Sequence, residues 1–335
     1  MVKTFAKTIL AVCATAFITG GMSSCDKVSA TGILIGGTGV DDRVEMSYKY
    51  VQEGLIPMVE GDVTGDDSYS FIIGSDSHIA DDTGRLAEMF SIGLKHDDLL
   101  YAHLGDLADT KADYYINTKK CVDEAKMNYV MKYFVQSEYD EDYWLDKETQ
   151  ADSIKYDDIL FPFFPVVGNH DITHNGWALF STIFKSSFYD FDVKVADDGT
   201  VDHFIFLDSA NGTFGRKQID LIENGAVDPD KKTRHVFVFT HTNFFRPSYT
   251  QFSSTFPREE MYYMMNKFNE WNCTFVFMGH VHKWDDRVFG GVHYLTLDSM
   301  GERNSPNPGN YLVRVTCHKD GKVEYEQVRM NYVKK

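Results

Sequence analysis

Short apolar runs recur along the chain from Tyr69 onward, and their lengths are typical of buried strands. Between several of them, apolar residues recur at spacings of three and four, which is the period of an amphipathic helix. This alternation predicts an α/β fold, and runs as apolar as HVFVFT predict strands that are covered on both faces. The expected strands are 69–74, 98–105, 160–168, 203–208, 235–240, 273–279 and 292–297. The expected helices are 84–96, 215–226 and 258–271.

Further patterns lie before, within and after this region. The stretches YLVRVTC (311–317) and KVEYEQVRM (322–330) are joined by HKDG, which predicts a closing hairpin. Residues 25–67 are rich in Gly, Asp and Thr around the alternating VEMSYKY (44–50), which predicts a tether and an edge strand. A long insert, 110–158, joins a helix-like stretch to the acidic, aromatic EYDEDYWLD. It could form a cap over a site or a solvated decoration.

Residues 1–24 are typical of a secretory signal peptide. Lys3 and Lys7 precede an apolar core of roughly a dozen residues, and small residues follow up to Cys25. The sequence MSSC that ends at Cys25 resembles a bacterial lipoprotein processing box, in which this cysteine becomes the lipidated first residue. An ordinary cleaved signal with an incidental cysteine is the alternative. We therefore expect export to the bacterial cell envelope on a lipid anchor, with one large domain at 68–335.

Charge and cysteine content narrow the range of partners. The 335 residues carry a formal net charge of -17 and show no basic patch, which argues against nucleic acid as a partner. If Cys13 leaves with the signal and Cys25 is acylated, then Cys121, Cys273 and Cys317 remain. Three cysteines allow at most one disulfide, and they lack the CxxC spacing of a zinc site.

Polar side chains of metal-ligand type follow five of the predicted strands. Because ligands of open α/β sheets bind beyond the carboxyl ends of the strands, we expect these side chains to meet at one edge. A single such residue is usually a satisfied polar group or part of a turn, but five groups together make coincidence improbable. The groups are Asp76 and His78; Asp106 and Asp109; Asn169, His170 and Asp171; His241; and His280 and His282.

The order of these groups, DxH, GDxxD, GNHD, H and GHxH, resembles the motif set of the calcineurin-like metallophosphoesterases over about residues 69–300. The resemblance implies a four-layer αββα sandwich of two mixed β-sheets flanked by helices, with two divalent cations at the sheet edge. It also implies that Asp106 bridges both cations and that Asp109 supports the ligands from behind. The other implied ligands are Asp76, His78 and His282 for the first cation, and Asn169, His241 and His280 for the second.

This resemblance implies a two-metal-dependent hydrolase of phosphomonoesters or phosphodiesters, in which a metal-bridging hydroxide is the nucleophile. The two cations outweigh the charges of Asp76, Asp106 and the hydroxide, so an acidic protein could still bind an anionic small-molecule phosphoester. His170, oriented by Asp171, would protonate the departing oxygen. Mixed nitrogen and oxygen ligands suit Mn, Fe or Zn.

Departures from related families narrow this interpretation. Asp109 stands where a purple acid phosphatase has its iron-binding tyrosine, and residues 283–335 are too few for the second domain of a 5'-nucleotidase. A catalytically inactive binding lipoprotein on the same scaffold is the alternative, although a decayed site should have lost a ligand and none is missing. A glycan or peptide hydrolase would need HExxH or a close pair of catalytic carboxylates, and neither is found. The substrate, the metals and the oligomeric state stay open.

Overall fold

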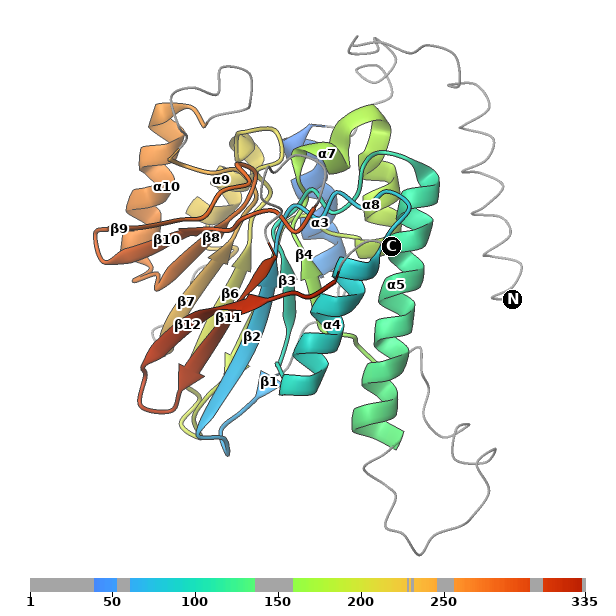
Figure 1. Ribbon diagram of the computed structural model, residues 1–335. Helices are drawn as coiled ribbons and strands as arrows, with labels where there is room; N and C mark the ends of the chain where they lie inside the picture. The colour runs from blue at the N-terminus through green and yellow to red at the C-terminus, as the bar shows by residue number, and fades with distance from the viewer. Residues whose placement is uncertain are drawn as a thin grey trace, which may run out of the picture. The chain divides into compact units, whose positions relative to one another are not determined.

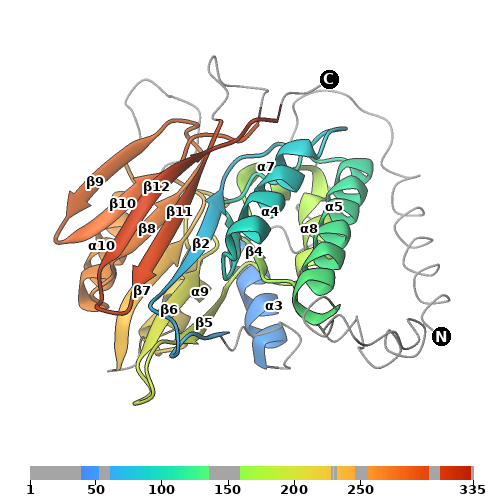
Figure 2. The same ribbon diagram turned by 60° about the horizontal axis from the view of Figure 1, so that its bottom comes forward.

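The computed structural model describes residues 39–52, 61–135, 159–227, 229, 232–245, 256–301 and 310–332. All of them belong to one compact unit, 37–335, in which two β-sheets lie face to face (Figures 1 and 2). Residues 1–24 and Cys25 lie outside the described residues, so the signal peptide and the lipid anchor stay predictions.

The larger sheet has seven strands in the order β1-β5-β6-β7-β8-β10-β9. Strands β6, β7 and β8 run parallel, whereas β5 and β9 are antiparallel to β6 and β10. The strands are β1 (Gly61–Asp62), β5 (Tyr189–Lys194), β6 (Val201–Phe206), β7 (Thr233–Phe239), β8 (Phe275–Met278), β9 (Asp285–Phe289) and β10 (Val292–Thr296).

The smaller sheet has five strands in the order β12-β11-β2-β3-β4. Strands β2, β3 and β4 run parallel, and β11 is antiparallel to both β2 and β12. The strands are β2 (Ser68–Gly74), β3 (Tyr101–His103), β4 (Phe163–Pro165), β11 (Tyr311–His318) and β12 (Val323–Arg329). The predicted closing hairpin is therefore present, and both sheets are mixed.

Phenylalanine side chains fill the space between the two sheets, because they alternate with aliphatic residues along the strands. In β6, Phe204 and Phe206 face this core, whereas Ile205 packs on the opposite side of the sheet. From the smaller sheet, Phe71 of β2 packs edge-on against Phe204 and Phe237, with ring centroids 5.3 and 5.2 Å apart. Strands buried on both faces explain why the apolar runs are continuous.

Helices cover the outer face of each sheet (Figure 1). Those on the smaller sheet are α4 (Gly84–His96), α5 (Ala112–Val130) and α8 (Gly176–Phe184). Those on the larger sheet are α3 (Val40–Gln52), α9 (Gly215–Glu223) and α10 (Arg258–Glu270). These layers confirm the predicted four-layer αββα sandwich, and α4, α9 and α10 correspond to the three predicted helices.

The predicted edge strand at 44–50 is wrong, because these residues belong to helix α3. Val40, Val44 and Ser47 recur at helical spacing and are buried, so the core uses the helical period of this segment. Helix α3 packs on α9 and β5 and is part of the domain rather than of a tether. The edge strand of the region is β1, which pairs in parallel with β5.

The described part of the insert 110–158 is a helix of the layer that covers the smaller sheet. Helix α5 packs against α4 and α8, and it buries Tyr115, Cys121 and Ala125 in the core beneath them. A short π-helical turn, Met131–Val135, continues it. This part is therefore neither a cap nor a solvated decoration, while the stretch EYDEDYWLD lies outside the described residues.

The cysteines and the helices of the described residues also bear on the expectations from the sequence. The three cysteines Cys121, Cys273 and Cys317 are buried free thiols, so the single disulfide that the sequence allowed does not form among them. Within the described ranges, no helix has the length and apolar character that crossing a bilayer requires.

Candidate metal centre

The strand ends of both sheets bring the predicted ligands to one place. Asp76 and His78 follow β2, Asp106 follows β3, and a short helix, α7 (Asn169–Ile172), follows β4. From the larger sheet, His241 follows β7, and His280 and His282 follow β8. Because the strands within each set are parallel, their carboxyl ends lie at the same edge of the sandwich.

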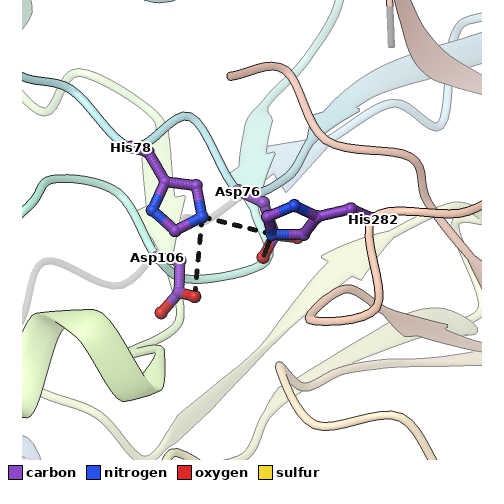
Figure 3. Close-up of side chains that lie close together, drawn as sticks. All are labelled: Asp76, His78, Asp106 and His282. Atoms are coloured by element: carbon purple, nitrogen blue, oxygen red, sulfur yellow. Dashed lines mark hydrogen bonds and ion pairs between the residues drawn. The ribbon is translucent and has the colours of Figure 1, made fainter. Parts of the chain in front are cut away.

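The first group consists of Asp76, His78, Asp106 and His282 (Figure 3). The His282 Nε2 atom lies 3.2 Å from Asp76 Oδ1 and 3.2 Å from His78 Nε2. The His78 Nε2 atom lies 3.8 Å from Asp106 Oδ2. All four side chains point toward one small volume, and all but His282 are buried.

The second group is built around His241. Its Nε2 atom lies 2.9 Å from Asn169 Oδ1, 3.2 Å from His280 Nδ1 and 3.5 Å from Asp106 Oδ1. The Asp106 carboxylate thus contributes Oδ2 to the first group and Oδ1 to the second. The structure therefore brings together all seven predicted ligands, in the two sets that the motifs implied and with Asp106 shared.

The hydrogen bonds behind the rings show that these residues fit bound cations. The Nδ1 atom of His241 lies 2.7 Å from the Leu104 carbonyl oxygen, which can only accept, so this nitrogen must donate. A neutral ring then has a lone pair on Nε2, which faces Asn169 Oδ1. In the same way, His78 Nδ1 faces Asp109 Oδ1 at 3.4 Å, so its Nε2 is free to act as a ligand. Hydrogen bonds of this kind orient the rings so that their other nitrogens face the place where a cation would bind.

The backbone at the site adopts conformations that most residues avoid. Five of the seven ligands have positive φ values. They are Asp76 (50°), His78 (42°), Asp106 (52°), His280 (72°) and His282 (51°). Gly168 is needed for a different reason, since a Cβ atom there would lie 2.1 Å from the Asp106 backbone nitrogen. The GNHD segment therefore approaches the bridging carboxylate as closely as only glycine allows.

His170 lies beside the two groups, and its side chain is 43% exposed. Its ring meets that of His78 edge-on with centroids 4.7 Å apart, and its Nδ1 atom lies 3.6 Å from Asp109 Oδ1. The Asp109 carboxylate, supported by the charge of Asp106 and opposed by burial, raises the pKa of His170 to about 9. The backbone N–H of His170 donates to Asp106 Oδ1 at 2.7 Å.

The expected pairing of His170 with Asp171 is wrong. The fully buried Asp171 carboxylate accepts hydrogen bonds from three backbone N–H groups and one phenol, those of Leu107, Ala108, Gly168 and Tyr115. Burial and the nearby Asp106 charge raise the pKa of Asp171 to about 6. Asp171 therefore holds the loops that carry Asp106 and Asn169 together, and Asp109 is the carboxylate beside His170.

A sequence profile of the calcineurin-like phosphoesterases matches residues 69–284, which is more than half of the chain. This protein belongs to the calcineurin-like phosphoesterase family. The seven predicted ligand positions lie within the matched residues. A comparison with curated proteins finds no match.

Solved structures of related fold resemble this calcineurin-like phosphoesterase at low identity. GAP50, the anchor in the inner membrane complex of Plasmodium, is 14% identical with a TM-score of 0.45, covering 80% of this chain and 90% of its own. A dimetal phosphatase from Danio rerio is 12% identical with a TM-score of 0.40, covering 78% and 99%. A putative 5'-nucleotidase from Staphylococcus aureus is 14% identical with a TM-score of 0.41, covering 78% and 53%. At such low identity, none of these proteins indicates a substrate for this chain.

One supporting residue escaped the sequence prediction. The hydroxyl of Ser209, which is fully buried after β6, accepts the backbone N–H groups of His241 and Thr242 at 3.1 and 2.9 Å. It thereby fixes the loop that presents His241. The pattern that identified the ligands also applies to Ser209, because Asp208 and Ser209 are polar residues directly after an apolar run.

Proposed function

We propose that this protein is a two-metal-dependent hydrolase of phosphomonoesters or phosphodiesters. The observation that carries the proposal is the shared Asp106 carboxylate, whose two oxygens belong to two separate groups of nitrogen and oxygen ligands. Such a shared carboxylate suits a pair of neighbouring divalent cations, for which Mn, Fe and Zn are candidates.

The two cations would supply a nucleophile from water at neutral pH and would offset the negative charge of the phosphoryl group. The protein's own contribution is to hold the ligands rigidly before the substrate arrives. Leu104 and Asp109 fix the ring orientations of His241 and His78. The buried Asp171 carboxylate fixes the loops on either side of Asp106. A site prepared in this way needs little rearrangement during the reaction.

We assign the general acid to His170. As the bond between phosphorus and the departing oxygen breaks, a protonated His170 would transfer its proton to that oxygen. Asp109 supports this role, because its carboxylate stabilises the protonated ring. The exposure of His170 beside both ligand groups allows a substrate to reach it.

The alternative, an inactive binding lipoprotein on the same scaffold, receives less support. A scaffold that had lost catalysis would be free to lose ligands. Here all seven predicted ligand positions lie in the two groups, and a half-exposed histidine lies beside them.

We also propose that the chain is exported and lipid-anchored through Cys25 at the bacterial cell envelope. The support is the pattern of the first residues: two lysines, an apolar core, and small residues before the cysteine. The partner of the domain would be a small-molecule phosphoester.

Metal removal and ligand substitution test the two-metal mechanism. Chelation should abolish phosphoester hydrolysis, and added Mn²⁺ should restore it. Because Asp106 belongs to both groups, Asp106→Asn should lose more metal and more activity than His78→Ala, which removes a ligand of one group. Metal content is measured by elemental analysis, together with initial rates on a panel of phosphoesters.

A matched control is Asp62→Asn in β1, where the carboxylate is half-exposed and lies outside both ligand groups. This variant should keep wild-type metal content and rates. Undiminished hydrolysis by protein shown to be free of metal would contradict the mechanism.

A further inference from the structure

The segment Asp298–Gly301, which follows β10, lies against the backbone that carries Asp76. The Ser299 hydroxyl donates to the Asp76 carbonyl oxygen at 2.7 Å, and the Gly301 N–H donates to the same oxygen at 3.0 Å. The Met300 N–H donates to the Ser75 carbonyl oxygen at 2.8 Å. Since β10 belongs to the larger sheet and Asp76 follows β2 of the smaller one, this segment joins the two sheets directly at the first ligand group.

These bonds hold Asp76 in a conformation that it would not adopt freely. Its φ of 50° lies in the left-handed region, which costs roughly 1 to 2 kcal/mol for a residue with a Cβ atom. On the other side of the residue, its own N–H donates to the Gly105 carbonyl oxygen at 3.0 Å. Both peptide groups that flank Asp76 are therefore fixed, and with them the direction in which its carboxylate points.

The segment is itself held in place, so it can act as a rigid support. A Cβ atom on Gly301 would lie 2.9 Å from the Asp76 carbonyl oxygen, so only glycine permits this approach. Met300 is fully buried in the core beneath α4. The Arg85 Nη1 atom of α4 donates to the Met300 carbonyl oxygen at 2.7 Å.

We propose that Ser299 is a positioning residue for the first cation, acting through the backbone carbonyl of Asp76. This inference rests on the proposed function, because it takes Asp76 to be a metal ligand. Without the hydroxyl, the Asp76 carbonyl oxygen keeps only the Gly301 N–H, so the backbone of Asp76 is held less tightly. The Ser75 hydroxyl and the His280 N–H still hold its carboxylate, so the cation site should weaken rather than disappear. The second group keeps its support, since Leu104 and Ser209 hold His241 independently.

The test is Mn²⁺ binding by the purified chain, measured by isothermal titration calorimetry. Loss of one hydrogen bond worth about 1 kcal/mol corresponds to roughly a fivefold change in affinity. Ser299→Ala should therefore weaken one of the two binding events by about fivefold and leave the other unchanged. Gly301→Ala, whose methyl group would push on the Asp76 carbonyl oxygen, should weaken the same event.

The matched control is Ser47→Ala in α3. Ser47 is as buried as Ser299, and its hydroxyl also donates to a backbone carbonyl oxygen at 2.7 Å, but it lies outside the ligand groups. This variant should lower the melting temperature as Ser299→Ala does, without changing either Mn²⁺ affinity.

Three results would decide the matter. Wild-type affinity for both ions in Ser299→Ala overturns the proposal, and so does an equal loss at both sites. Selective weakening of one ion in both the Ser299 and Gly301 variants supports it. Failure of the proposed hydrolase activity would give a different result. The wild-type chain would then bind two Mn²⁺ ions and respond to Ser299→Ala, but it would hydrolyse no phosphoester.

Discussion

His170 is the residue whose role the structure changes most. Its ring lies beside Asp109 rather than Asp171. It belongs to neither of the two predicted ligand groups, but together with His78 and Asp109 it forms a third cluster of possible ligand atoms. Consecutive residues of a helix project about 100° apart, so His170 and Asp171 of α7 face different surroundings. His170 faces the site, and Asp171 faces the buried loops.

A general acid at His170 predicts a dependence on the leaving group. His170→Ala should slow alkyl phosphoesters by roughly 100- to 10,000-fold, since an alkoxide must be protonated as it departs. Nitrophenyl esters should slow much less, because a nitrophenolate leaves without a proton. Steady-state rates on both substrate classes, with metal content measured in parallel, check this expectation.

The control for this prediction is His174→Ala, four residues further on, where the histidine is exposed and lies outside the ligand groups. It should affect both substrate classes little. Equal losses on both classes in His170→Ala, with metals retained, would show that His170 stabilises the phosphoryl oxygens instead. Loss of metal would make it a ligand.

Helix α3 is the element that ties the beginning of the domain to its core. Arg43 is fully buried and donates through Nε and Nη2 to the two oxygens of Asp208, at 2.7 and 2.8 Å. Its guanidinium also lies over the ring of Trp177 in α8. Asp208 directly precedes Ser209, which holds the loop of His241. The ion pair therefore connects α3, the end of β6 and α8.

Breaking this ion pair should destabilise the whole domain. Arg43→Met leaves the Asp208 carboxylate buried without its partner, which typically costs about 3 to 5 kcal/mol. Urea unfolding followed by circular dichroism measures the free energy of unfolding. The exposed pair of Arg216 with Asp220 provides the control, and Arg216→Met should change stability little. Similar values for the two variants would show that α3 is not an integral part of the core.

At the scale of the whole molecule, the proposed lipid anchor would set where the domain lies in the cell envelope. The sandwich that holds the site begins at α3, only a short distance in sequence from Cys25. A lipid on that cysteine would keep the domain close to the membrane surface.

Removing the lipidated cysteine should therefore release the protein. In a bacterial host, the wild-type chain is expected in the membrane fraction, and Cys25→Ser is expected in the soluble fraction. Cell fractionation followed by immunoblotting measures the distribution. Intact mass of the membrane-extracted protein provides the decisive check, because an unmodified Cys25 would contradict the anchor.

Much of the fold could be predicted because local sequence carries its signal. Apolar runs covered on both faces predicted strands in both sheets, and the helical spacing of residues 84–96 corresponds to α4. Residues that follow parallel strands of one sheet lie at the same edge, and the motif resemblance selected the seven predicted ligand positions among them. The stacking of the two sheets then brings the two edges together. Where a residue's partners follow from the direction of its strand, the sequence determines the site.

Tertiary contacts decided the rest. Residues 44–50 alternate as a strand does, yet they form helix α3. Arg43 of this helix binds Asp208, which lies 165 residues away, and Val40 and Val44 are buried in the core. Strand β9 is exposed along most of its length, so it has no apolar pattern to detect. The pairing of Asp109 with His170, and of Ser299 with Asp76, joins separate loops. Such partners depend on how the sheets stack, because hydrogen bonds between loops leave no period in the sequence.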